Sequence, residues 1–200
     1  ISYIPCRQLT IPIDRNALIR SGTLRSQDTI DLPSHISFSL PGSHIGKNTM
    51  IVLDIIANNN WERPIYFSSV NTDADVGLAE FMQLDGFAYR LVPIRSKPQN
   101  RLEPGRIISD SLYKRLMVQF DWKNMGDPNQ FVSYDIKRNV QVVDTRNIFV
   151  RLARQLFSEG DSARCIEVIE KSLRLMPHPQ YEYDFATLYQ IDLLYDARAS

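Results

Sequence analysis

Cysteine and histidine are scarce in this chain, and their scarcity excludes the common metal sites. The 200 residues include two cysteines and three histidines. A zinc site needs three or four such ligands, closely spaced on at least one element, and Cys6, Cys165, His35, His44 and His178 show no such spacing. We therefore expect no metal and no cofactor. We interpret the two cysteines as free, buried thiols rather than a disulfide, because free cysteine often serves as a small core residue.

The sequence also lacks an excess of charge and a long apolar run. Lys and Arg number 23, as do Asp and Glu, so the formal net charge is zero. A balanced charge gives no reason to expect binding to nucleic acid or to anionic lipid. No apolar run is long enough to span a bilayer, so we expect no membrane insertion by this segment. Because the sequence begins at Ile1 rather than at Met, we expect a fragment or a processed chain.

Motifs of common enzyme classes are missing. No G-x-S-x-G nucleophile motif occurs. Residues 42–48 resemble a phosphate-binding loop, but the glycines are one residue too close, and Asn48 stands where Ser or Thr is required. Several acidic residues near the centre of the chain are interpreted as surface-loop residues rather than a hydrolase pair; they are Asp54, Glu62, Asp73, Asp75 and Asp85. We expect no catalytic residue in this chain.

The first part of the chain mixes strand and helix patterns. Residues 9–13 and 36–40 alternate apolar and polar side chains, which is typical of half-buried strands, and Pro12 places the first at a sheet edge. Residues 14–20 predict a short helix, 77–84 a second, and 86–93 another strand. We predict an α+β fold over residues 1–127, with a small mixed sheet and packed helices.

The most distinctive stretch is LDIIANNNWERPIYF, residues 53–67. An apolar helix ends in three asparagines, which tolerate left-handed backbone and bond neighbouring amides. Pro64 then favours extended backbone at the preceding residue, and residues 65–67 form a short apolar strand. The stretch predicts a helix, a sharp polar turn and a strand.

Two interpretations of this turn remain open. In the first it is structural: the asparagines cap the helix, the aromatic rings fill the core, and the arginine bonds carbonyls or a carboxylate such as Asp54. In the second it is a carbohydrate-binding site, because aromatic rings cover the apolar face of a sugar while amide and guanidinium groups bond its hydroxyls. The candidate ligand-binding residues are Asn58, Asn59, Asn60, Trp61, Arg63 and Tyr66.

The region 128–200 has a purely helical pattern. Residues 131–157 contain no Gly or Pro, Gly160 ends that helix, Asp161 caps the next, and a last helix begins near Glu182. Earlier in the chain, residues 110–120 also show helical spacing, and Asp110 is the expected N-cap of that helix. The region 149–177 resembles one tetratricopeptide repeat. The matching positions are Phe149, Leu152, Ala153, Leu156, Cys165, Ile169, Ser172 and Pro177. One repeat is too few to stand alone. Its free face must pack on residues 131–143, on the C-terminal helix or on the α+β part, and we expect the first.

Residues 53–68, 83–93 and 145–160 resemble a family of large multi-pass membrane proteins of Bacteroidetes, in the soluble C-terminal region of those proteins. The membrane half of that family looks like the glycosyltransferases that use lipid-linked sugars, and protein O-mannosyl transfer has been assigned to some members. The resemblance implies a location on the periplasmic face of the inner membrane. It also implies that this chain is attached to a membrane-embedded N-terminal region that is absent here.

Two functions follow from these observations. The resemblance implies a non-catalytic accessory domain that positions acceptor protein or glycan for a reaction performed by the membrane-embedded region. The alternative is a protein-interaction or assembly module that uses the helical repeat and makes no contact with sugar.

Overall fold

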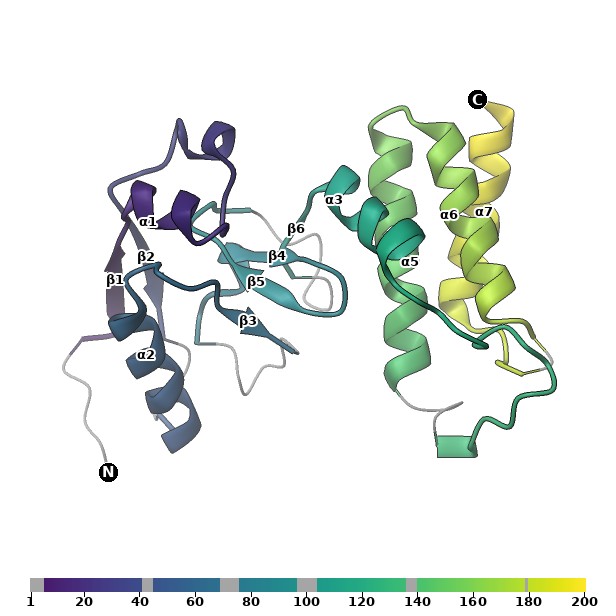
Figure 1. Cartoon of the computed structure of the whole chain (residues 1–200), viewed down its shortest axis with the longest axis horizontal. Helices are drawn as coiled ribbons and strands as arrows, with labels where there is room; N and C mark the ends of the chain where they lie inside the picture. Colours follow the sequence, from purple (N-terminus) through teal and green to yellow (C-terminus); the bar gives the residue numbers. More distant parts are fainter. Residues whose placement is uncertain (1–5, 41–44, 69–75, 97–103, 136–139, 179) are drawn as a thin grey trace. The chain divides into compact units, whose positions relative to one another are not determined.

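The computed structural model describes residues 6–40, 45–68, 76–96, 104–135, 140–178 and 180–200. The chain divides into two compact units, Ile1–Arg106 and Ile107–Ser200. The first is an α+β unit and the second is helical, so the predicted α+β class is confirmed (Figure 1). This division lies earlier in the chain than the boundary expected at Asp127.

The α+β unit begins with a two-stranded antiparallel ribbon. Strand β1 (Gln8–Pro12) pairs with β2 (His35–Ser39) along its whole length, with Leu9 opposite Phe38. Between them lie α1 (Arg15–Arg20) and a 3₁₀ turn, Ser26–Thr29. Asp14 caps α1 by accepting a hydrogen bond from the Ala17 amide, as its position in the sequence predicts.

Helix α2 (Lys47–Asn59) ends where the asparagines predict. Asn60 takes the C-cap position in left-handed backbone, with φ of 49°. The short strand β3 (Tyr66–Phe67) follows after the turn. The predicted helix, turn and strand are therefore all present.

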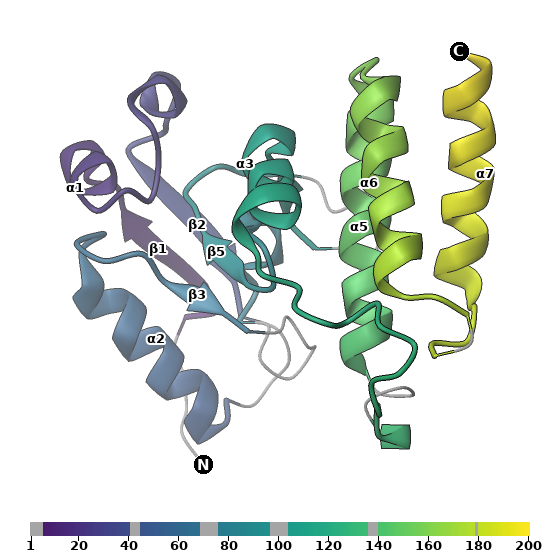
Figure 2. The ribbon, with the colours of Figure 1, turned by 45° about the vertical axis from the view of Figure 1, so that its right-hand side comes forward.

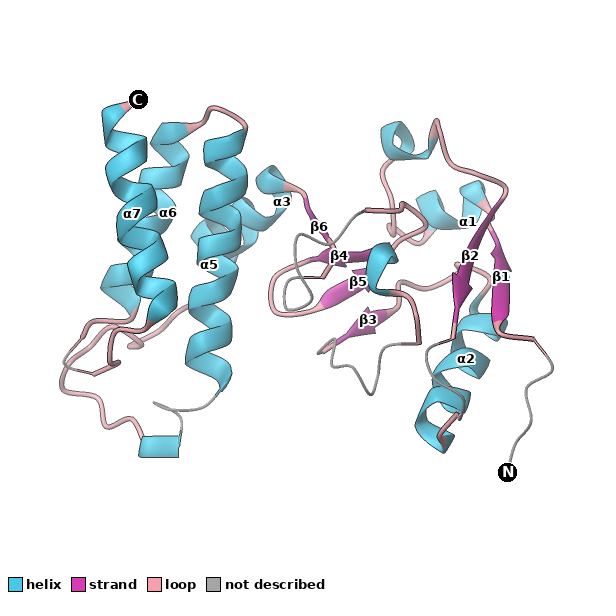
Figure 3. Cartoon of the chain, turned by 180° about the vertical axis from the view of Figure 1, so that it is seen from behind, coloured by secondary structure: helices cyan, strands magenta, loops and turns pink. Residues whose placement is uncertain are grey.

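A four-stranded sheet completes this unit, in the order β3-β5-β4-β6 (Figure 3). Strand β4 (Met82–Leu84) and β5 (Tyr89–Leu91) form an antiparallel hairpin, and β6 (Arg106–Ile107) lies at the far edge. The predicted helix over residues 77–84 is wrong. It is replaced by a 3₁₀ turn, Ala79–Phe81, and strand β4. The apolar spacing there resembles a helix, but pairing with β5 across the turn at Gly86 satisfies the backbone of residues 82–84 instead.

The core of the α+β unit joins the ribbon, α1, the end of α2 and the sheet. Its buried side chains come from segments far apart in the sequence, and include Leu18, Ile36, Phe38, Ile56, Trp61, Leu78, Phe81, Leu91 and Val92. Burial of these side chains away from water is the main stabilising contribution to this small unit.

The helical unit starts with α3 (Ser109–Lys114), which continues into a π-helical turn, Arg115–Gln119. Asp110 is not the N-cap that its position predicts. Ile108 holds that place without a side-chain bond, and Asp110 instead pairs with Arg164 of α6, with Oδ1 and Nη1 2.7 Å apart. The acid therefore ties α3 to α6 rather than ending its own helix.

Three longer helices follow: α5 (Val140–Ser158), α6 (Ser162–Leu175) and α7 (Phe185–Ala199). They lie side by side in Figure 2. Asp161 caps α6, as predicted, and Asp184 with Thr187 forms a capping box at the start of α7. The predicted helix over residues 131–157 is too long, because residues 131–133 are not helical; residues 136–139 lie outside the described part of the chain.

The tetratricopeptide-like packing of α5 and α6 is confirmed by burial. Phe149, Leu152, Ala153, Leu156, Cys165, Ile169 and Ser172 are at most 1% exposed. Small residues at three of these positions let the helices approach, and the large ones fill the remaining space. The free face of the hairpin is covered by α7, which packs on both α5 and α6. The expectation that residues 131–143 do this is corrected, since the last four of them belong to α5 itself.

Candidate functional site

The asparagines of the predicted binding turn mainly serve to end helix α2. The Asn58 amide donates to the Asp54 carbonyl and to its carboxylate, at 2.9 and 3.1 Å, one turn back on α2. Asn60 is the left-handed cap, and the Asn59 carbonyl accepts the Glu62 amide at 2.9 Å. The side-chain oxygen of Asn59 is buried without a hydrogen-bond partner among the described residues. Asn58 and Asn60 therefore serve to end the helix.

Trp61 is an anchor of the core rather than a surface platform. It is 6% exposed, and its indole Nε1 donates to the Pro12 carbonyl at 2.7 Å. Its φ of 61° is left-handed, a costly conformation for a bulky residue. The indole therefore joins the turn after α2 to the end of β1, which explains why this strain is tolerated.

Tyr66 and Arg63 remain on the surface. Tyr66 is 46% exposed, so its expected place in the core is wrong. Its hydroxyl donates to Asp85 at 3.0 Å, and the Arg90 guanidinium lies 5.5 Å from its ring centre. Arg63 is exposed and does not pair with Asp54, whose carboxylate instead accepts Asn58. The six predicted residues do not converge on one surface.

Asp85 and Arg90 form a charge pair that reasoning from the sequence missed, and the interpretation of Asp85 as a surface-loop residue is wrong because its side chain is buried. The Asp85 side chain is 1% exposed and accepts from both Arg90 and Tyr66. Arg90 also donates to the carbonyls of Gly22 and Thr23, at 3.0 and 3.1 Å. This pair links the β4–β5 hairpin to the loop after α1. Its signal in the sequence was two opposite charges flanking a hairpin glycine.

A second arginine, Arg106, is half-buried and bonds to strand β4. Arg106 donates through Nε to the Gln83 side chain at 3.0 Å, and its Nη2 is buried without a partner among the described residues. Burial is the largest cause that lowers the pKa of Arg106. Both half-buried arginines therefore bond groups within the α+β unit.

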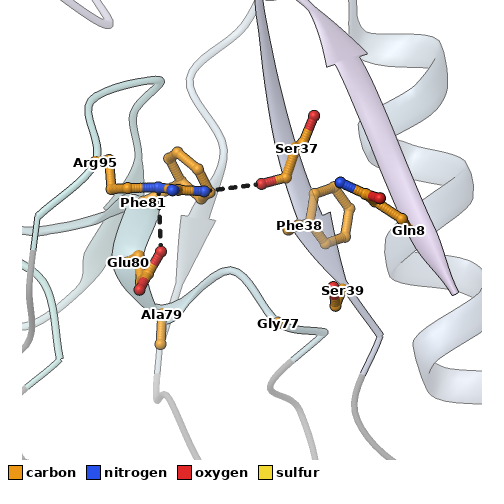
Figure 4. Close-up of a pocket in the computed structure, with 9 residues that line it drawn as sticks. All are labelled: Gln8, Ser37, Phe38, Ser39, Gly77, Ala79, Glu80, Phe81 and Arg95. Carbon is orange, nitrogen blue, oxygen red and sulfur yellow. Dashed lines mark hydrogen bonds and ion pairs between the residues drawn. The ribbon is translucent and has the colours of Figure 1, made fainter.

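A hollow in the α+β unit lies elsewhere, between β2 and the segment before β4 (Figure 4). It has a volume of about 410 Å³, which is within the range of sites for small molecules. We call it the β2 hollow. Its lining residues are Gln8, Ser37, Phe38, Ser39, Gly77, Ala79, Glu80, Phe81 and Arg95.

The β2 hollow is polar and carries one charge of each sign. Arg95 pairs with Glu80, with Nε and Oε2 3.2 Å apart, and donates to the Ser37 carbonyl at 3.2 Å. Its guanidinium lies 5.4 Å from the centre of the Phe81 ring. Arg95 and Glu80 are 63% and 47% exposed, so both can exchange partners with a ligand. The charges of the two groups cancel, and the hollow therefore suits a neutral ligand with many hydroxyls.

Gly77 shapes one wall of this hollow. Its φ is +83°, and a Cβ placed there would lie 2.0 Å from the Ser39 carbonyl oxygen. No side chain fits at this position, so the loop before β4 runs directly against β2. The hollow depends on this close approach of two backbones.

Among the described residues no group of three or more His, Cys, Asp or Glu side chains is placed to hold a metal ion; His44 lies outside the described residues. No described helix is both long and apolar enough to cross a bilayer.

The two cysteines differ, although both were expected to be buried. Cys6 is exposed and Cys165 is buried, and both are free thiols. We predict that a thiol reagent labels Cys6 in the folded protein and Cys165 only after unfolding. Mass spectrometry of labelled peptides measures this, with Cys6→Ser as the control that removes the fast reaction. Labelling of Cys165 at the rate of Cys6 would contradict the structure.

Burial also predicts an alkaline effect at Cys165. It raises the pKa of this thiol to about 11, compared with about 8.5 in an unfolded chain. The folded state favours the protonated thiol, so its contribution to stability is complete below pH about 8.5 and is lost as the pH rises toward about 11.

Comparison with known families agrees with the division of the chain. A sequence model of the family described as TMEM260-associated domain 2 matches residues 1–111, which span the α+β unit and reach α3. No curated protein and no solved structure matches the chain. Because the family match covers more than half of the 200 residues, this chain belongs to the TMEM260-associated domain 2 family, whose description associates it with a membrane protein.

Proposed function

We propose that this chain is a non-catalytic accessory domain of a membrane protein, and that it positions an acceptor glycan or glycoprotein through the β2 hollow. The membrane-embedded region of the same protein would perform the transfer. This proposal goes beyond the family assignment in two respects. The resemblance to glycosyltransferase-like proteins of Bacteroidetes implies that the transfer uses a lipid-linked sugar donor, and that this chain lies in the periplasm.

The observation that carries the proposal is the polar lining of the β2 hollow beside buried aromatic rings. Gln8, Ser37 and Ser39 are polar residues of the lining, and Glu80 and Arg95 offer an acceptor and several donors. A sugar presents many hydroxyls that both donate and accept, and it carries no charge. An anionic ligand such as a phosphate would meet Glu80 as well as Arg95, so the neutral ligand is favoured.

The Asn58–Tyr66 turn is a weaker candidate for the same role. Three of its residues, Asn58, Asn60 and Trp61, make bonds or hold backbone angles that end α2 and fix the turn. Tyr66 keeps an exposed ring, but its hydroxyl is engaged by Asp85. We therefore place the glycan contact at the β2 hollow and not at the turn.

Two arginine variants test this placement. In Arg95→Ala the β2 hollow loses its positively charged donor, and we expect binding of neutral monosaccharides to weaken by about tenfold, since an exposed charged hydrogen bond of this kind contributes on the order of 1.5 kcal/mol. Arg63→Ala removes an exposed arginine from the predicted turn and should leave binding unchanged. Titration of the chain with mannose, glucose, galactose and N-acetylglucosamine, followed by nuclear magnetic resonance shifts, measures both.

The outcomes separate the alternatives clearly. Loss of binding in Arg63→Ala but not in Arg95→Ala would move the site to the turn. Absence of binding by every sugar, together with full transfer by a parent protein that lacks this chain, would refute the proposal.

A second candidate function is a protein-interaction module, and a feature of the helical unit favours it. Large apolar side chains are exposed on α7, the last of the three packed helices. This candidate requires no contact with sugar.

A further inference from the structure

Helix α7 has an inverted distribution of apolar side chains. Its buried face consists of small or polar residues, Ala186, Thr187, Gln190 and Ala197. The opposite face carries the large ones. Phe185, Leu188, Tyr189 and Tyr195 are 82%, 57%, 62% and 74% exposed.

These residues form one continuous stripe along the helix. Positions 185, 188, 189, 192, 195 and 196 recur at the spacing of a single helical face. We call these six residues the α7 stripe. Two of its members, Asp192 and Asp196, are exposed acids, and neither pairs with a basic side chain among the described residues.

The inner face of α7 packs against helices α5 and α6. Gln190 donates to Ser172 of α6 at 2.7 Å in the interior, and α7 packs on both α5 and α6. Arg198 is engaged with Glu170 of α6 at 3.0 Å. The α7 stripe therefore points away from these contacts, and Figure 2 shows α7 running beside α6.

Stacked helical repeats bury such a stripe against the next helix and end in a polar face. The α7 stripe is aromatic and acidic, so it fits a helix whose apolar face is flanked by Lys or Arg. We infer that the α7 stripe is a docking surface for a basic amphipathic helix. This inference rests on the second candidate function and is independent of the β2 hollow.

A set of designed peptides tests the chemistry of the partner. The first has the length of α7 and contains only Leu and Lys, arranged to give one apolar helical face. The second replaces each Lys by Glu, and the third is a scrambled Leu–Lys sequence without a helical face. We expect the first to bind at least about tenfold more tightly than either of the others, by fluorescence anisotropy at physiological salt.

Matched phenylalanine variants locate the surface. Phe185→Ser removes an aromatic from the stripe and should weaken binding by about tenfold or more, as does Tyr189→Ser. Phe131→Ser is the control, because Phe131 is 92% exposed in the same unit but lies outside α7. Asp192→Asn with Asp196→Asn should remove the preference for Lys over Glu while leaving part of the affinity. Circular dichroism checks that each variant remains folded.

Each other outcome overturns the inference. If the Glu peptide bound as tightly as the Leu–Lys peptide or more tightly, the partner would not be basic, although the unit could still be an interaction module. Equal loss in Phe131→Ser would mean non-specific apolar contact. Self-association of the chain in sedimentation, abolished by Tyr189→Ser, would show that a second copy covers the stripe. Failure of every peptide to bind would remove both the inference and the second candidate function, with no bearing on sugar binding by the β2 hollow.

Discussion

Replacing Arg146 by alanine is expected to lower the free energy of unfolding of the helical unit by about 3–5 kcal/mol. Arg146 is 3% exposed and lies on α5. Its guanidinium donates to the carbonyls of Glu182, Tyr181 and Met176, at 2.6, 2.9 and 3.3 Å. It also pairs with Asp184, the N-cap of α7, at 3.2 Å.

This one side chain thus bonds to four residues between the end of α6 and the start of α7. Alanine would leave three carbonyls without this donor, and buried polar groups without partners are costly. Lysine supplies a single ammonium that cannot reach all four acceptors. The free energy of unfolding of Arg146→Lys should therefore fall between those of the unchanged protein and of Arg146→Ala. Urea unfolding followed by circular dichroism measures the change.

An exposed arginine in the same unit serves as the control. Arg198→Ala removes the ion pair with Glu170, in which both side chains are about half exposed. Such pairs contribute about 0–1 kcal/mol. If Arg146→Ala were no more destabilising than Arg198→Ala, the bonds to the α6–α7 connection would not stabilise the fold.

Replacing Trp61 by alanine is expected to cost the α+β unit about 3–5 kcal/mol. The indole is buried in the main core and its donor bonds to Pro12. Trp61→Phe keeps part of the packing but leaves the Pro12 carbonyl without this donor, so a smaller loss of about 1–3 kcal/mol should follow.

Glycine at position 61 separates packing from backbone strain. Trp61 has left-handed backbone, which glycine adopts without cost. Trp61→Gly should therefore be at least as stable as Trp61→Ala, the reverse of the usual order of these residues. Arg63→Ala, two residues away and exposed, should change stability by no more than about 0.5 kcal/mol. A small effect of Trp61→Ala with full loss of sugar binding would restore the interpretation of this turn as a binding site.

Residues with strong local preferences were predicted correctly from the sequence. Asp14 and Asp161 cap helices because a short carboxylate next to a helix start can accept a backbone amide whatever surrounds it. Asn60 ends α2 for a comparable local reason. The burial of Phe149, Ala153 and Cys165 was predicted from the tetratricopeptide-like pattern, because helix period fixes which side chains share a face.

Residues whose role depends on partners distant in the sequence were not predicted correctly. The stretch 82–84 became a strand because β5 pairs with it, and Asp110 bonds Arg164 rather than its own helix. The β2 hollow joins Gln8, Ser37 and Arg95, three residues that no local motif connects. Their meeting depends on the ribbon, on the hairpin and on the close approach of Gly77 to Ser39.

By itself the sequence determined the α+β class, the ends of most helices and the tetratricopeptide-like hairpin, because caps and periodicity act over a few residues. Only the tertiary structure decided that Trp61 is a core anchor, that Arg146 secures the start of α7, and that α7 keeps its aromatic side chains outside. Burial and hydrogen bonding are properties of a residue's neighbours in space, and those neighbours are set by packing of the whole unit.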